Sequence, residues 1–103
     1  MDSLPRLAGF DWDTANLGKC GKHGVSPQEI EALLNGTPHV ALDGKHSAQE
    51  KRFMAMGRTP AGRYVFIVFT LREKDGLTLL RPISARYMHK KEVTGYEKKG
   101  AAL

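Results

Sequence analysis

Hydrophobic residues near the start of the chain recur at helical spacing, between signals that begin and end helices. Asp13 can cap a helix that begins with "TANLGKCGKH", and Gly24 can take the left-handed conformation that ends it. "SPQE" places Ser26 directly before a proline and three residues before a glutamate, which is a capping box. We therefore expect helices over 14–23 and 27–34.

From "HVAL" onward the spacing changes from helical to alternating, which is typical of strands. "KDG" is a hairpin signal between two long segments of this kind. Including the short edge segment "GFDWD", we expect strands at 9–13, 39–42, 50–59, 63–73 and 77–87, and a final helix at about 89–99. The order β-α-α-β-β-β-β-α predicts an α+β fold, a compact antiparallel sheet flanked by two N-terminal helices and one C-terminal helix.

Length and composition are those of a small globular protein. At 103 residues the chain can form one modest core, and we expect a single domain over 1–103. The opening "MDSLPRLAGF" lacks the apolar stretch of a signal peptide, and "YVFIVF" is too short to cross a bilayer. These features and a lone cysteine, Cys20, predict a cytoplasmic protein without membrane contact.

Positive charge is concentrated in the second half of the chain. Residues 1–50 contain four Lys or Arg against seven Asp or Glu, and residues 51–103 contain twelve against four, so the halves have net charges of −3 and +8. Such an excess favours a polyanionic partner, most often nucleic acid. A solvated surface that keeps the protein soluble gives the same charge, so both interpretations stay open.

Three pairs of polar residues each share one face of a predicted strand, because strand side chains alternate. The pairs are Glu50 with Arg52, Thr70 with Arg72, and Ser84 with Arg86. If the "KDG" hairpin pairs its strands in a favourable register, the last two pairs lie at one end of the sheet. Guanidinium, hydroxyl and carboxylate groups together can hold a phosphodiester. The alternative is that these arginines project into water or pair with neighbouring acids.

RNA cleavage needs a group that takes the proton of the 2′-OH, cations that stabilise the charged transition state, and a donor for the leaving 5′-oxygen. Arginine suits the second role. The candidates for proton transfer are His46, Glu50, His23 and Lys22, and Ser84 could position a phosphate oxygen. His23 could equally interact with the C-terminus of its helix.

Metal and cofactor chemistry is not indicated. Cys20, His23, His39 and His46 include only one thiolate, and the second pair has the wrong separation for a zinc site. The chain has no Gly-rich phosphate loop, nucleophile elbow or paired-carboxylate motif. We therefore expect no metal and no cofactor.

Three aromatic residues, Trp12, Tyr87 and Tyr96, could stack on bases, although such residues more often fill a core or anchor a helix. Gly95 weakens the basic final helix, which suits a segment that a partner stabilises or displaces.

The chain contains, in order, "FDWD", "KHGVS", "HSAQEKRFMAMGRT", "GRYVFIVFTLRE" and "RPISARYMHKKEVTGYEK". In order and spacing these segments resemble the BrnT toxin family, the ribonuclease half of bacterial type II toxin–antitoxin systems. The likeness extends over about residues 9–98, and the combination of "KHG", "E-x-R", "T-x-R" and "SAR" makes it specific. It implies a RelE-like fold and an endoribonuclease that cleaves RNA and halts translation.

Carried over by motif, the resemblance points to the polar pairs above, to His46 and to "KH" of "KHGVS". On this basis we assign catalysis to His46, Glu50, Arg52, Arg72, Ser84 and Arg86. We assign RNA binding to Lys22, His23, Thr70, Arg81, Lys90 and Lys91. Pro82 removes one backbone donor, which leaves strand continuity near Ser84 open, and a bulge there could aim Arg86.

The resemblance further implies a cognate antitoxin that has a DNA-binding domain and covers the toxin, with the complex bound to operator DNA and repressing its own operon. A toxin homodimer within that complex is one arrangement that it allows. The alternative function is a non-catalytic basic module that docks nucleic acid or an acidic protein.

Overall fold

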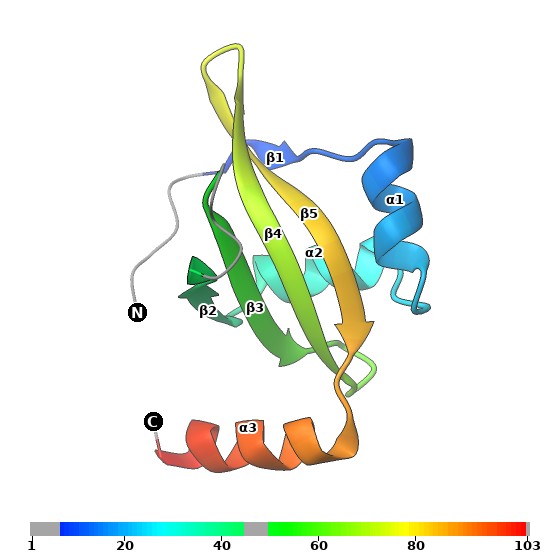
Figure 1. Cartoon of the computed structure of the whole chain (residues 1–103), viewed down its shortest axis with the longest axis vertical. Helices are drawn as coiled ribbons and strands as arrows, with labels where there is room; N and C mark the ends of the chain where they lie inside the picture. Colours follow the sequence, from blue (N-terminus) through cyan, green and yellow to red (C-terminus); the bar gives the residue numbers. More distant parts are fainter. Residues whose placement is uncertain (1–6, 45–49, 103) are drawn as a thin grey trace.

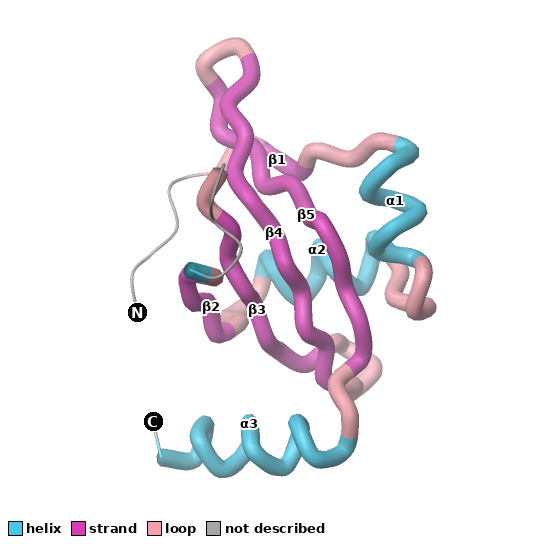
Figure 2. The backbone as a smooth tube through the Cα atoms, in the orientation of Figure 1, coloured by secondary structure: helices cyan, strands magenta, loops and turns pink. Residues whose placement is uncertain are grey.

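A mixed sheet organises the protein, whose computed structural model describes residues 7–44 and 50–102. Its strand order is β1-β5-β4-β3-β2 (Figure 1). The bounds are β1 Gly9–Phe10, β2 His39–Leu42, β3 Arg52–Arg58, β4 Tyr64–Lys74 and β5 Leu77–Tyr87. The β4–β5 hairpin extends beyond the other strands (Figure 2). It turns through Asp75 and Gly76, both of which have positive φ, as the "KDG" signal predicted.

Strands β2 to β5 pair antiparallel, as expected, but β1 pairs parallel to β5. The predicted α+β fold is confirmed, but the sheet is mixed rather than antiparallel at this edge. The physical reason is that no hairpin joins β1 to β5, so chain connectivity does not impose an antiparallel direction.

The three helices are α1 Thr14–Gly21, α2 Pro27–Asn35 and α3 Lys90–Ala102, which confirms the predicted element order. The Asp13 carboxylate accepts hydrogen bonds from two backbone N–H groups of the first turn of α1. Ser26 and the glutamate three residues later form the predicted capping box of α2. Gly24 has the expected positive φ, 86°, but lies in the turn after α1, because the helix already ends at Gly21. Among the described residues, no helix is both long and apolar enough to span a membrane.

The core lies between the sheet and the two N-terminal helices. Alternate β4 residues Val65, Ile67 and Phe69 are fully buried and pack with Ile30 and Leu33 of α2. Figure 1 shows α2 behind the sheet and α1 beside β5. The opposite side of β3, β4 and β5 faces away from α2 and is bordered by α1 along β5. We call this side the open face. It contains the even-numbered residues of β3 and β4 and the β5 residues opposite them.

A bulge interrupts β5 where Pro82 made strand continuity uncertain. Val68 pairs with Ser84 and Phe69 pairs with Pro82, so Ile83 is the extra residue. Regular alternation would place residues 81 and 84 on opposite faces. The inserted residue instead brings Arg81, opposite Thr70, onto the open face with the Ser84 side chain.

Candidate functional site

All the arginines of β3, β4 and β5 lie on the open face. They are Arg52 and Arg58 of β3, Arg72 of β4, and Arg81 and Arg86 of β5. Segregation of guanidinium groups to one face of a sheet makes that face a candidate surface for binding anions.

A cleft of about 210 Å³ lies at the end of the open face nearest the β4–β5 hairpin. Its lining residues are Ala15, Asn16, Lys19, Glu50, Arg52, Arg72, Arg81, Pro82 and Ile83. The structure thus brings together four of the predicted site residues. They are Glu50 from the segment before β3, Arg52 of β3, Arg72 of β4 and Arg81 of β5. Three of them are arginines and one is a carboxylate.

Glu50 and Arg72 form an ion pair at this cleft. The Arg72 Nε lies 3.3 Å from one carboxylate oxygen of Glu50, and Nη2 donates to the other at 3.4 Å. Side-chain exposures of 43% for Arg72 and 37% for Glu50 leave both groups accessible to a ligand. The pair therefore offers a base and a cation at the same point.

Arg81 is held in place by two acids from the segment before α1. Its guanidinium donates to the Asp13 carboxylate at 3.0 and 3.3 Å and lies 3.6 Å from Asp11. The hydrogen bond to Asp13 raises the pKa of Arg81, and the same bond lowers the pKa of the Asp13 carboxyl. With 15% of its side chain exposed, Arg81 is an oriented cation at the edge of the cleft.

Thr70 was predicted to contact RNA, but its side chain is buried, with a residue exposure of 1%. Its hydroxyl donates to the Lys51 carbonyl at 2.7 Å. In this arrangement Thr70 fixes the backbone between Glu50 and Arg52 and presents no hydroxyl to a ligand.

The structure does not bring the Thr70–Arg72 and Ser84–Arg86 pairs to one end of the sheet, so that expectation is wrong. Arg86 pairs with Phe66, which is six residues along β4 from Arg72. The two arginines are therefore about 20 Å apart. The reason is hairpin register, because residues close to the turn pair with each other and Arg72 therefore faces Leu79. Arg86 is instead bound to Glu92 of α3, at 2.7 and 2.8 Å.

The remaining predicted residues lie away from the cleft or outside the described residues. Lys22 and His23 are exposed after α1. The next residue, Gly24, accepts a hydrogen bond from Tyr87 at the far end of β5. Lys90 and Lys91 are exposed in the first turn of α3, and His46 lies outside the described residues.

Three residues of α1 that line the cleft, Ala15, Asn16 and Lys19, were not predicted. Asn16 is buried, and its amide donates to the carbonyls of Asp11 at 2.9 Å and Pro82 at 2.8 Å, which joins α1 to the bulge. Lys19 follows Asn16 by three residues and therefore lies on the same side of the helix. Helical spacing could have identified this face, but not its contact with β5.

Among the residues that the structure describes, no group of three His, Cys, Asp or Glu side chains could hold a metal ion. Cys20 is buried, and burial raises the pKa of its thiol to about 11, so the thiol stays protonated at neutral pH. Trp12 donates to Glu31 at 2.8 Å, and Tyr87 donates to Glu29, so both aromatic residues have structural hydrogen bonds.

Comparison with known proteins gives one family assignment. A search of curated proteins finds no match. The profile of the family described as "Ribonuclease toxin, BrnT, of type II toxin-antitoxin system" matches residues 12–92, a range that contains every side chain lining the cleft. The chain therefore belongs to the BrnT family of ribonuclease toxins of type II toxin–antitoxin systems.

Proposed function

We propose that this toxin is an endoribonuclease that cleaves RNA in the cleft, without a metal ion, and thereby inhibits translation. The observation that supports this most directly is the Glu50–Arg72 ion pair, which lies among further cations in one accessible cleft. A carboxylate and guanidinium groups at one point can supply both the proton transfer and the charge stabilisation that phosphodiester cleavage needs.

In the proposed reaction the 2′-oxygen of the RNA attacks the neighbouring phosphorus while Glu50 takes the 2′-OH proton. The O2′–P bond forms and the P–O5′ bond breaks, which leaves a 2′,3′-cyclic phosphate and a 5′-hydroxyl. Arg52 and Arg72 stabilise the charge that develops on the phosphate oxygens. His46, four residues before Glu50, is our candidate donor to the leaving 5′-oxygen.

Family membership implies an antitoxin partner. We expect this antitoxin to cover the toxin, to carry the DNA-binding domain, and to bind operator DNA as a complex with the toxin, which could be dimeric there. The arginine-rich open face supports such a role, because an acidic segment of the antitoxin would compete with RNA for the same cations.

The test is cleavage of a labelled RNA by the purified protein with and without a chelator of divalent ions. We expect cleavage to continue with the chelator, and Glu50→Gln to lower kcat by about 100-fold or more. The matched control is Glu73→Gln, which removes one carboxylate from an exposed position of β4. RNA binding without cleavage by the wild type would instead support the non-catalytic module.

A further inference from the structure

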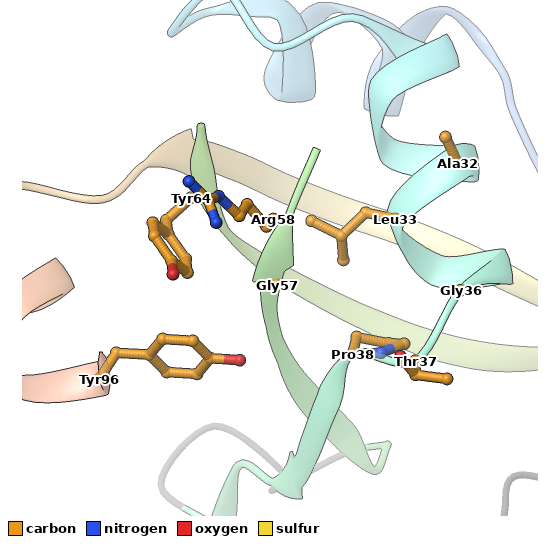
Figure 3. A pocket seen from close by; sticks show the side chains of 9 residues that line it. All are labelled: Ala32, Leu33, Gly36, Thr37, Pro38, Gly57, Arg58, Tyr64 and Tyr96. Atoms are coloured by element: carbon orange, nitrogen blue, oxygen red, sulfur yellow. The ribbon is translucent and has the colours of Figure 1, made fainter. Parts of the chain in front are cut away.

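A second, larger hollow lies at the end of β3 opposite to the cleft. It has a volume of about 430 Å³ and is formed where β2 stops pairing with β3, beyond Met56. Its lining residues, shown in Figure 3, are Ala32, Leu33, Gly36, Thr37, Pro38, Gly57, Arg58, Tyr64 and Tyr96. We call it the aromatic hollow.

One wall of the aromatic hollow consists of aromatic rings. The ring centres of Tyr64 and Tyr96 are 5.4 Å apart in an edge-on arrangement. Next to this wall, the His39 ring centre lies 5.2 Å from that of Tyr96. The Tyr64 hydroxyl donates to Glu97 at 3.0 Å, and the Tyr96 hydroxyl donates to the Met56 carbonyl at 3.4 Å. These hydrogen bonds at the phenol ends restrict how the rings can turn.

The opposite wall is aliphatic. Figure 3 shows Leu33 and Pro38 across the hollow from the two tyrosines, with Gly57 between the walls. A Cβ atom on Gly57 would lie 3.2 Å from the Leu33 side chain, so the lack of a side chain keeps this part of the hollow open. A flat ligand at the edge of β3 could therefore contact both an aromatic wall and an apolar one.

An exposed cation beside the hollow indicates that its ligand carries negative charge. The Arg58 guanidinium lies 5.3 Å from the centre of the Tyr64 ring, and the residue is exposed. Arg58 and Arg52 are on the same face of β3, six residues and about 20 Å apart. The hollow, at the edge of β3, thus adjoins the end of the open face that is opposite to the cleft.

We infer that the aromatic hollow binds an unpaired base of the RNA, flanking the nucleotides held in the cleft. Tyrosine and histidine rings and guanidinium planes are the groups on which single-stranded bases stack, largely without regard to sequence. Arg58 can contact the adjoining phosphate. This inference rests on the proposed function, because it takes RNA as the ligand of the open face.

The test compares two substrates and two variants. A dinucleotide reaches only the cleft, whereas an oligonucleotide of about ten nucleotides can reach both sites. Tyr64→Leu removes the ring while keeping an apolar side chain, and Arg58→Ala removes the cation. For the longer RNA we expect either variant to raise KM about tenfold with kcat unchanged, the typical effect of losing one stacked base. The KM for the dinucleotide should stay within about twofold of the wild-type value.

The matched control is Arg63→Ala, since Arg63 stacks on Tyr87, 3.4 Å from the ring centre, on the helix-covered side of the sheet. It removes the same charge and should leave both KM values near those of the wild type. A folded Tyr64→Leu protein with unchanged KM for the longer RNA would overturn the inference. So would variants that weaken only antitoxin binding, which would identify the hollow as a protein site.

A binding measurement separates this inference from the proposed reaction. A fluorescent oligonucleotide with 2′-deoxy sugars cannot undergo attack by a 2′-oxygen, so its affinity reports on binding without cleavage. The difference in affinity between wild type and Tyr64→Leu then reports on the subsite. If the wild type cleaves no RNA, the proposed function fails. The subsite would still be supported by about tenfold weaker binding to Tyr64→Leu than to wild type, and rejected by equal binding.

Discussion

The guanidinium of Arg86 is held by the carboxylate of Glu92 through two parallel hydrogen bonds of 2.7 and 2.8 Å. Arg86 belongs to the open face and Glu92 to the first turn of α3, where the same carboxylate also accepts the backbone N–H of His89. A carboxylate therefore occupies the donors that a phosphate oxygen would otherwise use. Docking of α3 and the availability of Arg86 to RNA are coupled through this contact.

Replacing Glu92 by Gln should release Arg86 for RNA. We expect the KM for RNA, or the Kd of an uncleavable analogue, to fall about fivefold, because a charged hydrogen-bonding partner is lost from the guanidinium. Steady-state kinetics and fluorescence anisotropy measure the two constants. Glu73→Gln makes the same change in net charge at an exposed β4 position and should have little effect. Equal affinity of Glu92→Gln and wild type would show that the contact does not compete with RNA.

The same contact predicts how stability depends on pH. The hydrogen bond from Arg86 lowers the pKa of the Glu92 carboxyl from 4.5 to about 2. A depressed pKa in the folded protein means that the stabilisation is present above about pH 4.5 and is lost as the pH falls towards 2. Thermal unfolding of wild type and Glu92→Gln should therefore differ most above pH 4.5 and converge near pH 2. A constant difference across this range would exclude Glu92 as the titrating group.

The structure distinguishes two lysines that look equivalent in the sequence. Lys19 lines the cleft, whereas Lys22 follows α1 in a turn connected to the far end of β5. Lys19→Ala should raise the KM for RNA several-fold with kcat unchanged and reduce its salt dependence, because a phosphate contact is lost. Lys22→Ala is the matched control. A larger effect from Lys22 would favour the motif-based assignment over the geometry of the cleft.

Asn16 should stabilise both the fold and the cleft. Asn16→Ala leaves two buried carbonyls, of Asp11 and Pro82, without their amide donor. We expect a loss of about 1–3 kcal/mol in the free energy of unfolding. Urea denaturation measures it, and kcat/KM should fall because α1 no longer holds the bulge. Asn35→Ala, at an exposed position of α2, is the control. Unchanged stability would mean that other groups satisfy these carbonyls.

Much of the fold could be predicted from local signals in the sequence. The caps at Asp13 and Ser26 and the hairpin turn at Asp75–Gly76 depend on residues within a few positions of each other, and the structure has all three. The parallel pairing of β1 could not be predicted in this way, because it joins Gly9 and Phe10 to residues some 70 positions later. Helix ends shifted by one to three residues, since capping leaves the last turn weakly determined.

The sequence by itself determined the chemistry of the protein, an arginine-rich second half and the order of elements that presents it, because charge and periodicity are local properties of the chain. Only the tertiary structure decided which groups meet. The hairpin register placed Arg86 about 20 Å from Arg72, and the extra residue at Ile83 turned Arg81 onto the open face. Pairing register and bulges depend on contacts between distant segments, and a shift of one residue moves a side chain to the other side of a sheet.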